Sequence, residues 1–139
     1  MNLFSLSTIH SRVLGDFHNV PVVKNARNYN TILVSGDQLK RLDELDGEAV
    51  KEDRYVAATG FVVKIEEFSY PKAKPTKRAL KMILDFDGFV TEKVMWPDYD
   101  SGELRYPKEL VKNSIATIFM RKRLGKKDMS VTEIVVETT

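Results

Sequence analysis

The chain has 139 residues, of which 42% are hydrophobic and 30% are charged, and its formal net charge is +2. These values are typical of a globular chain with one core of ordinary size. No apolar run approaches the ~20 residues of a membrane span, and the N-terminal residues lack the pattern of a signal peptide. The absence of cysteine excludes disulfides, thiol catalysis and thiolate zinc sites. We therefore expect a cytoplasmic protein without a membrane partner.

The charge is distributed unevenly along the chain. Residues 1–53 carry 6 Lys/Arg against 8 Asp/Glu, which gives −2, whereas residues 54–139 carry 16 against 12, which gives +4. The basic excess therefore lies in the part of the chain that has the strongest β pattern. Because a basic surface attracts polyanions, its placement indicates nucleic acid as a partner.

The first 53 residues predict a short α/β extension. Residues 20–23 are expected to be extended because the proline at 21 disfavours helix in the residue before it. Residues 31–34 predict a short strand, and a short helix follows it. The helix signals are Ser35 or Asp37 as N-cap, Leu39, Leu42 and Leu45 on one face, and Asp46-Gly47 as its end.

From Arg54 onward the sequence predicts five strands, after a boundary in the acidic stretch 46–53. The first strand contains Gly60, and a glycine within a strand indicates a bulge or a tight bend where one strand serves both halves of a small barrel. Asp87-Gly88 is a strong signal for a two-residue hairpin turn. The expected strands are 55–65, 79–86, 89–96, 114–124 and 129–137, and the second has Leu80, Met82, Leu84 and Phe86 on one face.

The connections complete the predicted topology. A polar loop is expected over 67–78, where prolines at 71 and 75 interrupt the pattern, and another over 98–105. Residues 106–113 predict one or two helical turns with Pro107 near the start. This order predicts a mainly β fold over 54–139, a five-stranded OB-type Greek-key barrel with a short helix between strands 3 and 4. An SH3-like barrel is the main alternative.

Residues 54–137 resemble the anticodon-binding type of OB domain. The resemblance depends on Gly60 in the first strand, on the acidic hairpin from Asp85 to Gly88, and on Trp96-Pro97, which ends the third strand. Such domains occur in the bacterial DNA polymerase III alpha subunit and in class II aminoacyl-tRNA synthetases. The polymerase resemblance implies single-stranded DNA as ligand and the synthetase resemblance implies tRNA, and neither implies catalysis.

Two basic loops are the candidate phosphate-binding elements. In an OB fold they lie on the same side of the barrel and flank the face made by strands 2 and 3, so they would form one positive groove. The simpler alternative is that charged residues gather in loops because loops are exposed to water. The candidates are Lys72, Lys74, Lys77 and Arg78 in the first loop, Arg121, Arg123, Lys126 and Lys127 around the last hairpin, and Lys81 on the second strand.

Aromatic side chains on the exposed face would stack with bases. Tyr70 lies in the polar loop and is the best candidate for an exposed platform. Phe89 shares a strand face with Thr91 and Lys93, which predicts an exposed position. Trp96 is a third candidate, although a tryptophan on a strand is more often part of the core. Phe86 is expected in the core.

The sequence offers no nucleophile–base pair from which to build a reaction, so we expect a protein that is not an enzyme. His10 and His18 lie too far apart for one helical turn, and Asp85 and Asp87 are explained by the hairpin turn. We expect no metal and no cofactor. The predicted function is a single-stranded DNA- or RNA-binding module, accessory to a DNA replication or repair protein and part of a larger polymerase or repair assembly. The alternative is a protein–protein interaction module.

Overall fold

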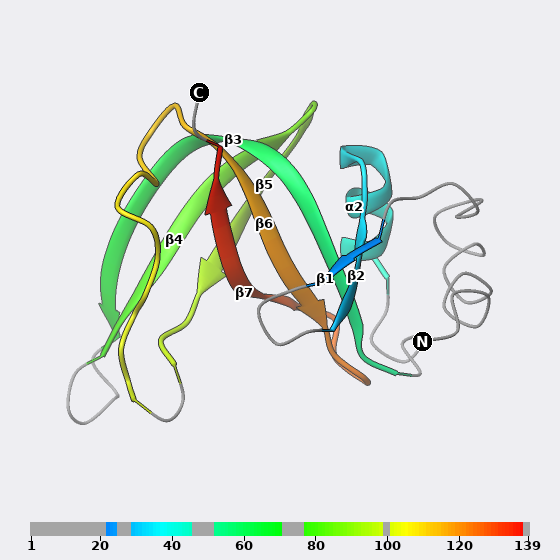
Figure 1. The fold of residues 1–139 in the computed structure, drawn as a ribbon. Helices are drawn as coiled ribbons and strands as arrows, with labels where there is room; N and C mark the ends of the chain where they lie inside the picture. The colour runs from blue at the N-terminus through cyan, green and yellow to red at the C-terminus, as the bar shows by residue number, and fades with distance from the viewer. Residues whose placement is uncertain (1–21, 25–28, 46–51, 71–76, 99–100, 138–139) are drawn as a thin grey trace.

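The computed structural model describes residues 22–24, 29–45, 52–70, 77–98 and 101–137. In this part of the chain one short helix accompanies a seven-stranded sheet, so the predicted mainly β fold is confirmed (Figure 1). The elements are β1 (Val22–Lys24), β2 (Asn30–Leu33), α2 (Gly36–Asp43), β3 (Arg54–Tyr70), β4 (Lys77–Phe86), β5 (Phe89–Met95), β6 (Ile115–Lys122) and β7 (Met129–Val136).

Strand β3 organises the sheet because it pairs with three different strands, β2, β4 and β6. Its first half, from Arg54 to Phe61, is antiparallel to β6, and its second half, from Phe61 to Tyr70, is antiparallel to β4. The expected strand that serves both halves is therefore confirmed, and Figure 1 shows β3 as a long arch. The register shift lies between Val62 and Lys64, just beyond Gly60. A Cβ atom at Gly60 would lie 2.8 Å from the Phe86 ring, so the role of this glycine is to let Phe86 pack closely against β3 and not to form the bulge.

The sheet is open within the described residues. Its order is β1-β2-β3-β4-β5, and on the other side β6 pairs with β3 and β7 pairs with β6. Strand β5 pairs with β4 alone and β7 pairs with β6 alone, so β5 and β7 leave two free edges that approach each other. The described strands therefore do not complete the hydrogen-bonded barrel that the sequence predicts.

The β4–β5 hairpin forms as predicted. Asp87 and Gly88 have φ values of 52° and 100°, the conformation that a two-residue turn between twisted strands requires. Asp85 Oδ1 accepts a hydrogen bond of 2.8 Å from the backbone N–H of Gly88 and so stabilises the turn. The apolar face of β4, from Leu80 to Phe86, is fully buried in the core.

Helix α2 begins at a capping box. Ser35 Oγ accepts from the backbone N–H of Gln38 at 3.2 Å, and the Gln38 side chain accepts from the backbone N–H of Ser35 at 2.9 Å. Leu39 and Leu42 are buried in the same core as the strands, and β2 pairs in parallel with β3. The helix ends at Asp43, before the expected Asp46-Gly47 stop, which lies outside the described residues. The boundary at residue 53 stays a prediction.

Two expected connections differ from the structure. Residues 106–113 are not helical; they form two consecutive turns, closed by hydrogen bonds from Leu110 N to Pro107 O and from Ser114 N to Val111 O. The Ser114 hydroxyl also bonds the backbone of Val111, so it satisfies groups that a helix would otherwise pair. Leu110 nevertheless enters the core. The loop expected over 67–78 is shorter, because β3 continues to Tyr70 and β4 begins at Lys77.

Candidate functional site

The outer face of β3, β4 and β5 carries an aromatic pair at one end. Phe68 on β3 pairs with Ala79 on β4. Trp96 directly follows Met95, the last residue of β5, which pairs with Leu80. The rings of Phe68 and Trp96 meet edge to face, with centroids 6.0 Å apart and an interplanar angle of 77°. Ala79 is completely buried, whereas Trp96 is 52% exposed. Trp96, one of the candidate stacking residues, therefore lies at the surface and not in the core, and its role in binding stays a prediction.

Lys81 lies on the same outer face but is surrounded by carboxylates. Its Nζ atom is 3.2 Å from Glu66 on β3 and 3.8 Å from Glu92 on β5. Exposed pairs of this kind contribute little to stability, but they neutralise the lysine. Lys81 is thus less suited to a phosphate than the sequence predicts.

The opposite face of β5 points into the molecule. The two-residue turn pairs Phe86 with Phe89, and the register continues to Met82 and Lys93. Because paired residues share one face of a sheet, Phe89 packs against the core and Lys93 is only 6% exposed. The expectation that Phe89 is an exposed platform is therefore wrong.

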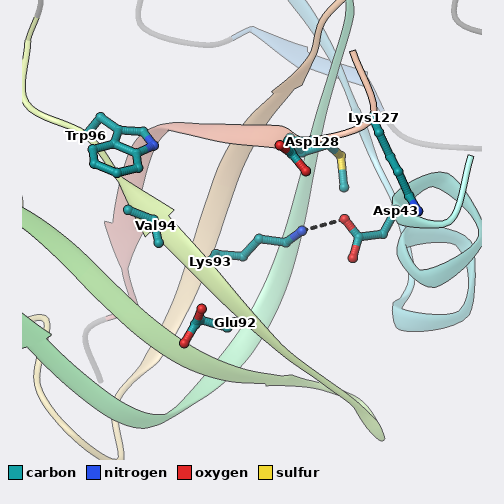
Figure 2. Close-up of a pocket in the computed structure, with 8 residues that line it drawn as sticks. Asp43, Glu92, Lys93, Val94, Trp96, Lys127 and Asp128 are labelled. Carbon is teal, nitrogen blue, oxygen red and sulfur yellow. Dashed lines mark hydrogen bonds and ion pairs between the residues drawn. The ribbon is translucent and has the colours of Figure 1, made fainter. Parts of the chain in front are cut away.

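A pocket of about 370 Å³ lies along the free edge of β5, and we call it the β5-edge pocket. It lies between β5, the C-terminal end of α2 and the start of β7. Figure 2 shows Trp96 at one side of this space and Lys127 and Asp43 at the other. The lining residues are Asp43, Glu92, Lys93, Val94, Trp96, Lys127, Asp128 and Met129.

Two buried lysines join α2 to the sheet beside this pocket. Lys93 Nζ donates to Asp43 Oδ1 at 2.6 Å (Figure 2). Lys122, at the end of β6, is completely buried, and its Nζ donates to the carbonyl oxygens of Leu45 and Lys127. Burial lowers the pKa of Lys122, while the Asp43 carboxylate opposes this shift. Both lysines therefore act within the fold and are not free cations.

The turn between β6 and β7, residues 123–128, carries the free cations of this region. Arg121 is already paired with Asp53, whose other oxygen accepts from the backbone N–H of Leu124 at 2.8 Å. The Leu124 N–H, and then Arg121, lower the pKa of Asp53. By contrast, three exposed side chains of the turn form no hydrogen bond or ion pair with another described residue: Arg123, Lys126 and Lys127.

The structure describes the first basic loop, expected over 67–78, only at its two ends. Arg78 is exposed and lies 3.5 Å from the Glu67 carboxylate, and Lys77 is partly buried at the start of β4. Lys77 pairs with Tyr70 at one end of β3, whereas the β6–β7 turn lies beside Arg54 at the other end. Lys72, Lys74 and the Tyr70 side chain lie outside the described residues, so a groove between the two loops stays a prediction.

A second pocket, of about 670 Å³, lies between Glu67 on β3 and the segment 104–110. Tyr106 contributes to it, and burial followed by the neighbouring Glu67 carboxylate raises the pKa of its hydroxyl. The lining residues are Glu67, Leu104, Arg105, Tyr106, Lys108 and Leu110. This pocket contains none of the residues that the sequence singled out.

Sequence reasoning did not identify Asp43, Lys93 or Asp128 as site residues. For Lys93 a signal was present, because a two-residue turn at Asp87-Gly88 sets the whole β4–β5 register and turns Lys93 inward. Asp43 could not be found in this way, since its contact with β5 depends on how α2 packs across the sheet. Asp128 carried no sequence signal beyond its place in a turn.

Within the described ranges, no three His, Cys, Asp or Glu side chains are grouped so that they could hold a metal ion. His10 and His18 lie outside those ranges. The described helix is also too short and too polar to cross a membrane. Comparison with known protein families, with curated proteins and with solved structures gives no match.

Proposed function

We propose that this chain is an OB-type module that binds single-stranded nucleic acid and serves a DNA replication or repair assembly in the cytoplasm. The observation that carries the proposal is the composition of the β5 edge. An exposed tryptophan lies on one side of the β5-edge pocket, and Lys127, one of the free cations of the 123–128 turn, lies on the other. Single strands are bound by this combination, in which bases stack on aromatic rings and phosphates meet Lys or Arg.

The fold supports the same proposal. A long curved strand that pairs with three others, a tight hairpin after it and a C-terminal hairpin are compatible with an OB layout. In such folds the ligand face lies on the strands that correspond to β4 and β5, and here Trp96 directly follows β5 while Phe68 lies on the neighbouring strand β3. An open gap between β5 and β7 is compatible with the partly open barrels of this class.

The test is a titration of a fluorescently labelled oligonucleotide of about 15 bases at several salt concentrations. We expect Lys126→Ala/Lys127→Ala to weaken binding for all sequences alike. The matched control is Lys108→Ala/Lys112→Ala, which removes the same charge at the opposite end of β6. Three free cations predict a slope of log K against log salt of about −2, since each phosphate contact contributes about −0.7. Absent binding, or binding that does not respond to salt, would refute the proposal.

A protein-interaction module is the second candidate, because one outer face is apolar. Phe61 and Ile115 are direct neighbours across β3 and β6, and Val135 on β7 pairs with Thr117, two residues along β6 from Ile115. Phe61, Ile115 and Val135 are each more than 40% exposed. This function predicts that the chain self-associates or binds a partner through that face and that Ile115→Asp abolishes the association, as measured by sedimentation velocity. A monomer at all concentrations with no partner recovered would contradict it.

A further inference from the structure

The β5-edge pocket has a charge balance that disfavours a phosphate inside it. Three carboxylates line it, from Asp43, Glu92 and Asp128, against two ammonium groups, from Lys93 and Lys127. The Lys93 ammonium is already held by Asp43 at 2.6 Å. The interior therefore offers hydrogen-bond acceptors, and the phosphates of a bound strand would remain outside, along the basic turn.

Asp128 is the carboxylate best placed to receive a ligand. Its side chain is exposed and forms no hydrogen bond or ion pair with another described residue. Figure 2 shows it between Trp96 and Asp43, with the nitrogen-bearing edge of the Trp96 indole turned toward the pocket. Glu92 is the second acceptor, although Lys81 lies 3.8 Å from it. A half-exposed aromatic ring and an exposed carboxylate thus line the same pocket.

We propose that this pocket takes one unstacked guanine base, which lies against the Trp96 indole and donates to the Asp128 carboxylate. This inference rests on the proposed function. The Watson–Crick edge of guanine has two adjacent N–H donors, which match the two oxygens of a carboxylate that can only accept. Thymine and uracil place one donor between two carbonyls, and adenine and cytosine place an amino group beside a ring acceptor, so each would set a lone pair against the carboxylate. The volume of about 370 Å³ is at the small end of ligand pockets, as a single base requires.

Trp96 is the one tryptophan of the chain, so its fluorescence reports directly on this pocket. The experiment compares two oligonucleotides of about 15 bases, one of thymine alone and one with a single central guanine, at constant salt. Each oligonucleotide is made as DNA and as RNA, with uracil in place of thymine in the RNA. Whichever of the two binds more tightly identifies whether the guanine belongs to DNA or to RNA. We expect the guanine oligonucleotide to bind about tenfold more tightly than its partner and to quench Trp96 more strongly.

Asp128→Asn should abolish this preference while both oligonucleotides still bind, because an amide replaces one acceptor with a donor. Asp128→Glu should keep it, and Asp87→Asn, which removes an equally exposed acid from the β4–β5 turn, should leave it unchanged. Equal affinity of the wild-type protein for the two oligonucleotides would overturn the guanine assignment and leave the proposed function standing. A preference that survives in Asp128→Asn would overturn it too. Binding of neither oligonucleotide would remove the proposed function itself.

Discussion

The ion pair between Lys93 and Asp43 predicts an asymmetric response to mutation, because its two partners are buried to different degrees. Lys93 is 6% exposed and Asp43 is 25% exposed. Asp43→Asn leaves a buried ammonium without its counter-charge, which costs about 3–5 kcal/mol in a fully buried pair. Since Asp43 reaches solvent, we reduce this to about 2–3 kcal/mol. Lys93→Met keeps an apolar stem and leaves a carboxylate that water can solvate, so it should cost no more than about 1 kcal/mol.

The assay is urea unfolding at neutral pH, followed by far-ultraviolet circular dichroism. The double variant should be about as stable as Lys93→Met alone, so the coupling energy of the double-mutant cycle should equal the cost of Asp43→Asn, about 2–3 kcal/mol. Glu44→Gln, an exposed acid at the next position, removes the same charge and should have almost no effect. The reasoning is refuted if Lys93→Met costs as much as Asp43→Asn, or if the effects of the two changes simply add.

Three further predictions concern the fold. Gly60→Ala would place a Cβ atom 2.8 Å from the buried Phe86 ring and should destabilise by about 1–3 kcal/mol in urea unfolding, and Phe86→Leu should cost less in that background than alone. The Leu124 N–H lowers the pKa of Asp53 in the folded protein. The Asp53 carboxylate therefore contributes its full stabilisation above its unfolded pKa of about 3.9, and this stabilisation is lost as the pH falls through the lower folded value. Asp53→Asn should remove this loss of stability at acid pH from a stability–pH profile. Ser35→Ala should cost about 1 kcal/mol in thermal unfolding, and Ser35→Asp should retain most of the cap.

The elements that the sequence predicts best are those that local chemistry determines. The alternation from Leu80 to Phe86 and the Asp87-Gly88 turn both follow from side-chain period and backbone preference, and both agree with the structure. The capped helix after Ser35 is of the same kind. Each of these signals lies within about ten residues of the chain, and none depends on a distant partner.

Most of the predictions that failed depend on packing between distant segments, whereas residues 106–113 differ because of a local hydrogen bond. Residues 106–113 contain good helix formers, but Ser114 closes a turn there instead. A tryptophan on a strand is more often part of the core, yet Trp96, a candidate for base stacking, lies on the outer face, where its ring meets that of Phe68 edge to face. Fully buried Lys122 has the same local sequence character as its exposed neighbour Arg123. Sequence alone could not distinguish the two, because Lys122 depends on acceptors at Leu45 and Lys127 that folding brings together.

The open edge of β5 explains why the candidate site exists at all. Had β5 and β7 been hydrogen-bonded along their length, the space that Trp96, Lys127 and Asp128 share would be filled by the ladder between the two strands. The C-terminal end of α2 lies at this opening, and Asp43 supplies the counter-charge without which Lys93 could not be buried there. The same departure from a closed barrel that strand patterns could not predict therefore produces both the pocket and its mixed charge. A polyanion can approach such a pocket from its basic turn while only a neutral base enters it, which is why we assign affinity to the turn and selectivity to Asp128.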